Sequence, residues 1–249
     1  MSVDIVMADN SPFDGRSLQE RPLGGAQAGF AYLAQALAAL GHRVRAYTGT
    51  ARALEEGDAD LAALTCVPPE YIGDACTTPF ARVGLAIVVH PQNGLPGLTM
   101  IQLQKLFQGQ VEDWATWGGL PGTPEIISRE EGAGAYAFFQ SRAMRETRVT
   151  LTALLAPSTE AVLQAVGEEP LAVGYLSTAG IDGRVRPLAI EGVPPTSETI
   201  NSGLYPLTRD LHVMTMEEPQ GAARDFIQWL LSPAGQEILT AQRFQVPPQ

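Results

Sequence analysis

Apolar residues recur along the chain with two different periods, and segments of the two kinds alternate. Short apolar runs at 3–8 and 83–91 predict strands, whereas the Ala/Leu-rich segment 26–41, which ends at Gly41, predicts a helix. An alternating strand pattern at 42–49 follows that helix, so the chain begins with a β-α-β unit. This order is typical of an α/β protein whose sheets are mostly parallel and flanked by helices.

The alternation continues to the C-terminus. Further strands are predicted at the end of 51–65 and at 124–130, 171–177 and 211–216. Further helices are predicted at the start of 51–65 and at 99–109, 135–144, 158–170, 221–232 and 233–244, with caps at Ser158 and Ser232. The Pro-rich stretch 192–203 reads as an irregular connection. The order of elements thus predicts a second α/β layer after the first.

Composition limits the class of protein and of partner. The chain has 249 residues, 45% of them hydrophobic, which suits one large core or two modest ones. Its formal charge of -11 disfavours nucleic acid and anionic membranes as partners, although a locally positive pocket can still hold an anion. No apolar stretch approaches the roughly 18 residues of a membrane span.

The N-terminus and the two cysteines bear on the cellular compartment. The first residues lack a basic segment followed by a long apolar run and read as a strand, not an export signal. As written, the chain is expected in the cytoplasm, and outside it if the true start differs. Cys66 and Cys76 either form one bridge or are two unlinked small hydrophobic residues.

Motifs for catalysis are sparse. His42, His90 and His212 have no metal-ligand spacing, and no G-x-S-x-G element occurs. The single lysine, Lys105, does not lie in a phosphate-binding loop motif. We therefore expect no metal, no cofactor and no enzymatic activity.

The segment SREEGAGAYAFF, residues 128–139, carries the clearest binding signal. It places Arg129, which is followed by Glu130 and Glu131, shortly before Gly132, Ala133, Gly134 and Ala135 at a predicted strand-to-helix junction, where α/β proteins bind ligands. The first amides of a helix lack internal partners and favour an anion, and an arginine adds a fork of donors. The segment is either an anion site or an ordinary turn.

Other predicted strand ends also carry small polar side chains. Backbone amides and hydroxyls from converging loops can surround a small polar ligand. Each of these loops is also explained by ordinary turn chemistry. The further candidates for the pocket are Asn10, Ser11, Thr48, Thr50 and Thr65.

From about Tyr47 onward the motifs resemble a known family. The runs LQKLFQGQVEDW, REEGAG and YPLTR occur in the order found in phosphate-type solute-binding proteins of ABC importers. This resemblance implies the type II periplasmic-binding-protein fold, with lobe one at 1–83 plus 200–249, lobe two at 84–199 and the ligand captured between them. It also implies a monomer that binds phosphate or a related small inorganic or organic anion and works with an ABC permease.

The chain departs from that family pattern at three positions. Arg129 matches the family's anion-binding arginine, but Ala133 and Ala135 replace the hydroxyl residues of its Gly-Ser-Gly-Thr helix start. Thr65 stands where phosphate-specific members place a carboxylate. The resemblance therefore leaves two alternatives, a pocket with altered selectivity or a degenerate scaffold that binds nothing.

The first 48 residues resemble a different family. Their Gly24-Gly25 pair before a predicted helix is similar to the start of GT-B glycosyltransferases, in which such a pair approaches a sugar nucleotide. No counterpart of that fold's second Rossmann domain follows. The alternatives are a grafted β-α-β unit, a misassembled gene and, as a competing function, sugar-nucleotide binding.

Overall fold

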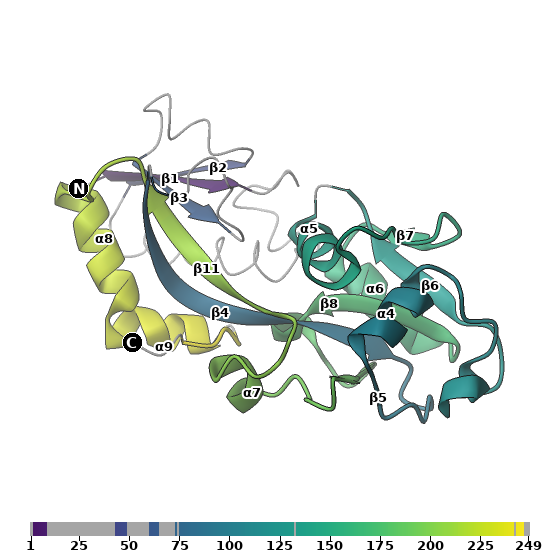
Figure 1. Ribbon diagram of the computed structural model, residues 1–249. Helices are drawn as coiled ribbons and strands as arrows, with labels where there is room; N and C mark the ends of the chain where they lie inside the picture. The colour runs from purple at the N-terminus through teal and green to yellow at the C-terminus, as the bar shows by residue number, and fades with distance from the viewer. Residues whose placement is uncertain are drawn as a thin grey trace. The chain divides into compact units, whose positions relative to one another are not determined.

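The computed structural model describes residues 2–8, 43–48, 60–64, 73, 75–131, 133–241 and 243–246, the first two ranges as backbone only. Contacts divide the chain into two compact units (Figure 1). Unit 1 comprises Met1–Val83 and Arg209–Gln249, and unit 2 comprises Gly84–Thr208. The predicted helix at 26–41, the helix within 51–65 and the Gly24-Gly25 motif lie outside the described residues.

Unit 1 contains three parallel strands. β1 (Ser2–Ala8) pairs with both β2 (Arg43–Thr48) and β3 (Leu61–Leu64). β11 (Thr208–Thr215) lies antiparallel to β3, and the long strand β4 (Cys76–Val89) follows β11 in the sheet. Arg82 of β4 donates two hydrogen bonds to Asp210 of β11, from Nε to Oδ1 at 2.6 Å and from Nη2 to Oδ2 at 3.1 Å. This ion pair links the side chains of the two neighbouring strands.

Two helices complete the described part of unit 1. α8 (Gly221–Leu231) buries Phe226 and Leu230 against strand residues such as Val213, and α9 (Pro233–Ala241) follows it directly. Pro233 occupies the first position of α9, where its missing amide costs nothing. Cys76, at the start of β4, is an exposed free thiol, and Cys66 lies outside the described residues.

In unit 2 the strand order is β4, β8 (Ala172–Ser177), β6 (Glu125–Arg129) and β7 (Leu154–Ala156). β8, β6 and β7 are parallel, whereas β4 is antiparallel to β8 and also pairs with β9 (Arg186–Pro187). A separate pair joins β5 (Gly97–Leu98) to β10 (Ala189–Ile190). The sheets are therefore mixed, because each unit adds an antiparallel strand to a parallel set of three.

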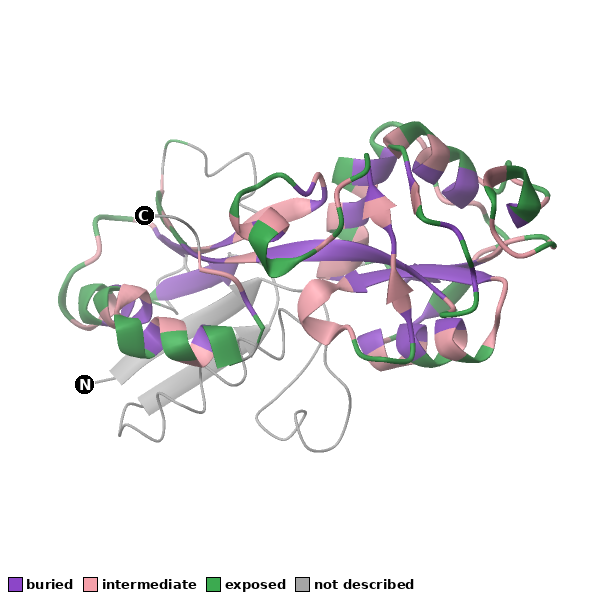
Figure 2. Cartoon of the chain, turned by 90° about the horizontal axis from the view of Figure 1, so that it is seen from below, coloured by how far each residue is buried: buried purple, intermediate pink, exposed green. Residues whose placement is uncertain are grey.

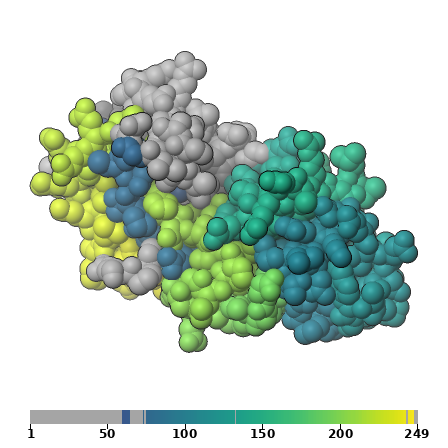
Figure 3. All heavy atoms as spheres, in the orientation of Figure 1, coloured from purple at the N-terminus to yellow at the C-terminus, as the bar shows by residue number. Residues whose placement is uncertain are grey.

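Helices cover both faces of the unit 2 sheet, and the strands are apolar on both sides. Along β4, Leu85 and Ile87 join the core beneath α4 (Met100–Phe107) and α5 (Gly134–Phe139), whereas Ala86 and Val88 face α6 (Thr159–Glu168). Side chains alternate between faces along a strand, so a doubly covered strand must be apolar throughout. Figure 2 shows the long buried strand in purple. In Figure 3 unit 2 is coloured from blue at residue 84 to green at residue 208, and the described unit 1 residues just before and after it have neighbouring colours.

The structure corrects three expectations about elements. The strand predicted at 83–91 runs from Cys76 to Val89, and the prediction missed its start because the first four residues are mostly exposed and lack the apolar run on which the prediction rests. The segment 192–203 contains a short helix, α7 (Ser197–Asn201), started by a capping box between Thr196 and Thr199. The helix predicted at 135–144 changes after α5 into one turn of π-helix, Gln140–Met144. In addition, a 3-10 turn, Trp114–Trp117, lies between α4 and β6.

Candidate functional site

Strand β6 delivers Arg129 to the carboxyl edge of the parallel strands of unit 2. The residue is only 5% exposed. Its Nε donates to the carbonyl of Ala156 at 3.0 Å, and its Nη2 donates to the carbonyl of Pro157 at 3.3 Å. These two bonds fix the direction of the guanidinium at the end of the neighbouring strand β7.

A buried hydroxyl network holds the backbone of β6 next to Arg129. The hydroxyl of Tyr175 accepts a bond from the Arg129 amide at 3.2 Å and lies 3.0 Å from Ser128 Oγ. The Tyr175 ring stacks on Phe139 of α5, with centroids 4.1 Å apart. Burial raises the pKa of Tyr175 above its ordinary value, which further favours the protonated hydroxyl. One tyrosine therefore ties β8, β6 and α5 together.

The start of α5 is where the sequence places an anion cradle. Ala133 is the N-cap residue, with extended backbone and no side-chain cap. Its amide donates to the carbonyl of Glu130 at 3.2 Å, so this amide is engaged in the turn itself. Gly134 and Ala135 are the first two residues of the helix and are half-buried. Gly132 lies outside the described residues.

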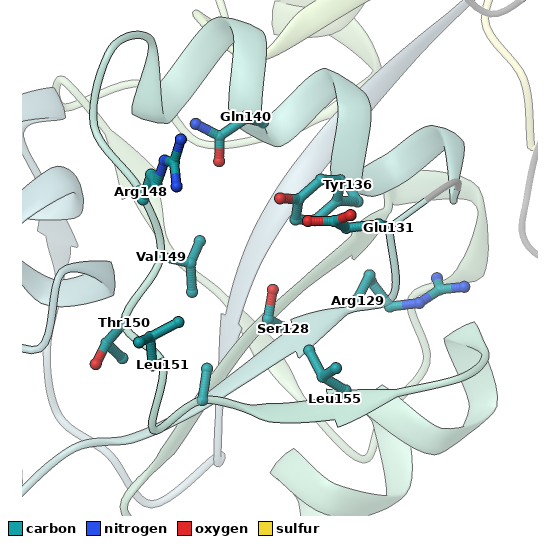
Figure 4. A pocket seen from close by; sticks show the side chains of 11 residues that line it. Ser128, Arg129, Glu131, Tyr136, Gln140, Arg148, Val149, Thr150, Leu151 and Leu155 are labelled. Carbon is teal, nitrogen blue, oxygen red and sulfur yellow. The ribbon is translucent and has the colours of Figure 1, made fainter.

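A pocket of about 530 Å³ opens beside these residues, between α5 with its π-helical turn and the strands β6 and β7 (Figure 4). Ser128 and Leu155 are register partners on adjacent strands and form its floor. Tyr136 and Gln140 lie four residues apart, on one face of the helix, and form the opposite wall. The complete lining is Ser128, Arg129, Glu131, Tyr136, Gln140, Arg148, Val149, Thr150, Leu151, Ala153 and Leu155.

The charges of the pocket are separated along it. Figure 4 shows Arg148 and Gln140 on one side, and Glu131, Tyr136 and Arg129 on the other. The guanidinium of Arg129 points away from Arg148 in this view. The pocket therefore offers a cation at one end and a mixed cation and carboxylate group at the other.

The remaining predicted site residues belong to unit 1. Thr48 ends β2, and the register of β1 with its two neighbours brings Ala8, Thr48 and Leu64 to the same edge of the sheet. The other four candidates follow these strands in the sequence. Asn10, Ser11, Thr50 and Thr65 lie outside the described residues.

Two residues carry no signal that singles them out in the sequence: Tyr175, which supports the end of β6, and Arg148, which lines the pocket. Tyr175 lies in an apolar strand segment, AVGYLS, and only the rule that a buried tyrosine hydroxyl needs a partner points to a network there. Arg148 is one of several arginines between 142 and 148, and nothing in its spacing separates it from the others. Among the described residues, no cluster of three or more His, Cys, Asp or Glu side chains suits a metal ion.

Among the helices that the structure describes, none is long and apolar enough to cross a membrane.

Comparison with solved structures confirms the expected fold. An ABC-type phosphate transport receptor from Vibrio cholerae superposes with a TM-score of 0.78 at 24% identity, covering 98% of this chain and 99% of that one. A putative phosphate ABC transporter substrate-binding protein from Clostridium perfringens, solved with bound phosphate, gives 0.75 at 20% identity over the full length of both chains. At these identities the likeness shows the architecture alone.

Sequence relatives carry phosphate-binding names. The phosphate-binding protein PstS of Bacillus subtilis (strain 168) is 27% identical over 168 residues, which are 67% of this chain and 56% of that protein. PstS 2 of Streptococcus pneumoniae serotype 4 is 32% identical over 131 residues, 49% of this chain and 45% of that protein. The chain spans about half the length of these two relatives.

A family model decides the assignment. The model described as a PBP superfamily domain matches residues 38–234, most of the chain, and includes every described element from β2 to the start of α9. This match covers the region of the motifs discussed above, including Arg129 and the start of α5. The first 37 residues, with the Gly24-Gly25 pair, lie outside it. The chain therefore belongs to the PBP superfamily, in the family that this domain model describes.

Proposed function

We propose that the chain is a non-enzymatic solute-binding protein that binds phosphate or a related small oxyanion for an ABC importer. The observation that carries this proposal is the position of Arg129. It ends a parallel strand, is separated from helix α5 by four residues and is oriented by two carbonyls, in a family member whose named relatives are phosphate-binding proteins.

The chemistry of the site suits an oxyanion. A guanidinium pairs with two oxygens of such a ligand through parallel, charge-assisted hydrogen bonds. Because the hydrogen bonds from Nε and Nη2 hold its plane, Arg129 loses little further side-chain freedom on binding. The amide of Ala135, at the second position of α5, adds a donor that helices leave without an internal partner.

Selectivity is expected to differ from that of a site lined with hydroxyls. Ala133 and Ala135 cannot donate from their side chains, so a bound phosphate would lose those hydrogen bonds. Each such bond to a charged group contributes about 1.5–3 kcal/mol. We propose that affinity for phosphate is correspondingly modest and that discrimination between phosphate and sulfate is weak.

The proposal includes a partner and a location. An importer receptor delivers its solute to a permease, so we propose that the chain works as a monomer with an ABC permease on the outer side of the membrane. The candidates Thr48, Thr50, Thr65, Asn10 and Ser11 remain proposed contributors from unit 1.

Thermal unfolding with and without ligand tests the proposal. Phosphate should raise the melting temperature of the whole protein, because a ligand that binds only the folded state stabilises it. Arg129→Gln should remove the shift, whereas Arg142→Gln, an exposed arginine outside the pocket, should retain it. A flat response to phosphate, sulfate and small organic anions would leave the degenerate scaffold as the correct reading.

A further inference from the structure

The pocket beside Arg129 is larger than a small oxyanion needs. A phosphate ion occupies the space of two or three water molecules, at roughly 30 Å³ each. The cavity measures about 530 Å³, within the range of pockets that hold organic ligands. Its walls include Val149, Leu151 and Leu155, so much of this space is bordered by apolar side chains.

These apolar side chains are unusually exposed. Leu151 projects fully into solvent and Leu155 is 64% exposed. Leu155 stands on the same sheet face as Ser128, its register partner, and so faces the pocket. Exposed apolar groups gathered around a cavity mark binding sites more often than isolated ones do.

One cation of the pocket has no assigned role in the fold. Within the residues that the structure describes, no hydrogen bond or ion pair ties Arg148 to another group. Figure 4 shows it across the pocket from Glu131, so an anionic group beside Arg148 avoids the carboxylate. The electrostatics thus orient a ligand with its acidic end toward Arg148.

The segment that carries Arg148 is anchored on both sides. Gln140 Nε2 donates to the carbonyl of Thr147 at 2.5 Å, and the Thr150 amide donates to the carbonyl of Phe107 at 2.8 Å. Gln140 itself begins the π-helical turn, an irregularity that often occurs at functional sites. The pocket wall is therefore held in place before any ligand arrives.

We propose that this pocket is a binding site for a small organic anion, a carboxylate or phosphate monoester attached to an apolar group. The acidic group pairs with Arg148, and the apolar group packs against Val149, Leu151 and Leu155. This site goes beyond the oxyanion site proposed at Arg129, because its cation, its apolar wall and its ligand class are different.

Titration of the whole protein with benzoate and with phenyl phosphate tests this proposal, with benzyl alcohol as the uncharged probe and inorganic phosphate titrated separately. At least one of the two acids should bind saturably, and benzyl alcohol should bind much more weakly. Arg148→Gln should weaken the binding of that acid about tenfold or more, while Arg142→Gln leaves it unchanged. Comparing the affinities for benzoate and phenyl phosphate shows whether the pocket prefers a carboxylate or a phosphate ester.

A matched pair of leucine variants tests the apolar wall. Leu155→Thr should weaken acid binding several-fold, whereas Leu154→Thr should not, because Leu154 is the neighbouring exposed residue on β7 and lies outside the pocket lining. Absence of saturable binding by both acids, or equal losses in the two members of either pair, would overturn the proposal. Binding of inorganic phosphate that depends on Arg129 tests the proposed function and not this pocket, so the two proposals can fail independently.

Discussion

At the scale of the residue, Tyr175 determines how firmly the end of β6 is held. Replacing Tyr175 with Phe removes the hydroxyl that serves both the Arg129 amide and Ser128 Oγ, and leaves two buried polar groups without that partner. Such a loss costs about 1–3 kcal/mol. We expect Tyr175→Phe to lower the free energy of unfolding in urea by this amount. The double variant Ser128→Ala/Tyr175→Phe should lose less than the sum of the single losses, and strict additivity would argue against the network.

His212 gives a prediction about pH. Burial lowers the pKa of His212 below its ordinary 6.5, so the unfolded chain takes up a proton near pH 6.5 and the folded chain only at lower pH. The stability that neutral His212 contributes is therefore present above pH ~6.5 and is lost as the pH falls from there through the folded pKa. The free energy of unfolding should fall less between about pH 7 and pH 5 in His212→Gln than in the unchanged chain. Identical pH profiles would contradict this.

Individual site residues were predictable only where a motif named them. Arg129 follows from its place between an apolar strand and a glycine-containing helix start. Tyr175 and Arg148 do not, because their roles depend on which strand lies next to β6 and on where the 147–153 segment returns. Those are long-range contacts, and a single sequence shows local spacing alone.

At the scale of the element, the helix caps give a reciprocal pair of predictions. Ser158 caps α6 by accepting from the Ala161 amide at 3.1 Å, whereas Ala133 begins α5 without a side-chain cap. Ser158→Ala should destabilise the protein by about 1 kcal/mol, and Ala133→Ser should stabilise it by up to a similar amount. Chemical denaturation of both variants measures this. An unchanged stability in Ser158→Ala would show that the cap does not limit α6.

Glycine at the junction of α8 and α9 makes a second prediction at this scale. A Cβ on Gly235 would lie 2.5 Å from the carbonyl oxygen of Trp229 and 2.7 Å from that of Leu230. These are backbone atoms, so the two helices would have to separate. Gly235→Ala should lower the melting temperature, while Ala234→Gly, its exposed neighbour in the first turn, should have only a small effect. Equal effects would mean that the close packing is not required.

Elements with strong local signals were predictable, and those with conflicting signals were not. The capped helices α4 and α6 and the apolar strand β8 appear where their patterns place them. α7 was missed because Pro194 and Pro195 suggest an irregular segment, although the Thr196 capping box starts a helix immediately afterwards. The π-helical turn at Gln140 has no sequence signal that we can name.

At the scale of the whole molecule, strand direction was the part of the fold that local patterns conveyed least. A mostly parallel sheet follows from alternating strands and helices, yet β4 and β11 each run antiparallel to a neighbour. The resemblance to solute-binding proteins, and not the periodicity, predicted that the N-terminal and C-terminal segments of the chain belong to the same compact unit. The described contacts divide the chain at Val83 and Arg209, while the lobe boundaries inferred from the resemblance remain a proposal.

The central claim is that the protein binds phosphate or a related oxyanion through Arg129. Calorimetric titration with inorganic phosphate tests this claim most directly. We predict saturable binding by the unchanged chain and by Arg142→Gln. In Arg129→Gln, affinity should fall about tenfold or more, at a melting temperature without ligand that still indicates a folded protein. Absence of phosphate binding, or binding that Arg129→Gln leaves unchanged, would contradict the account.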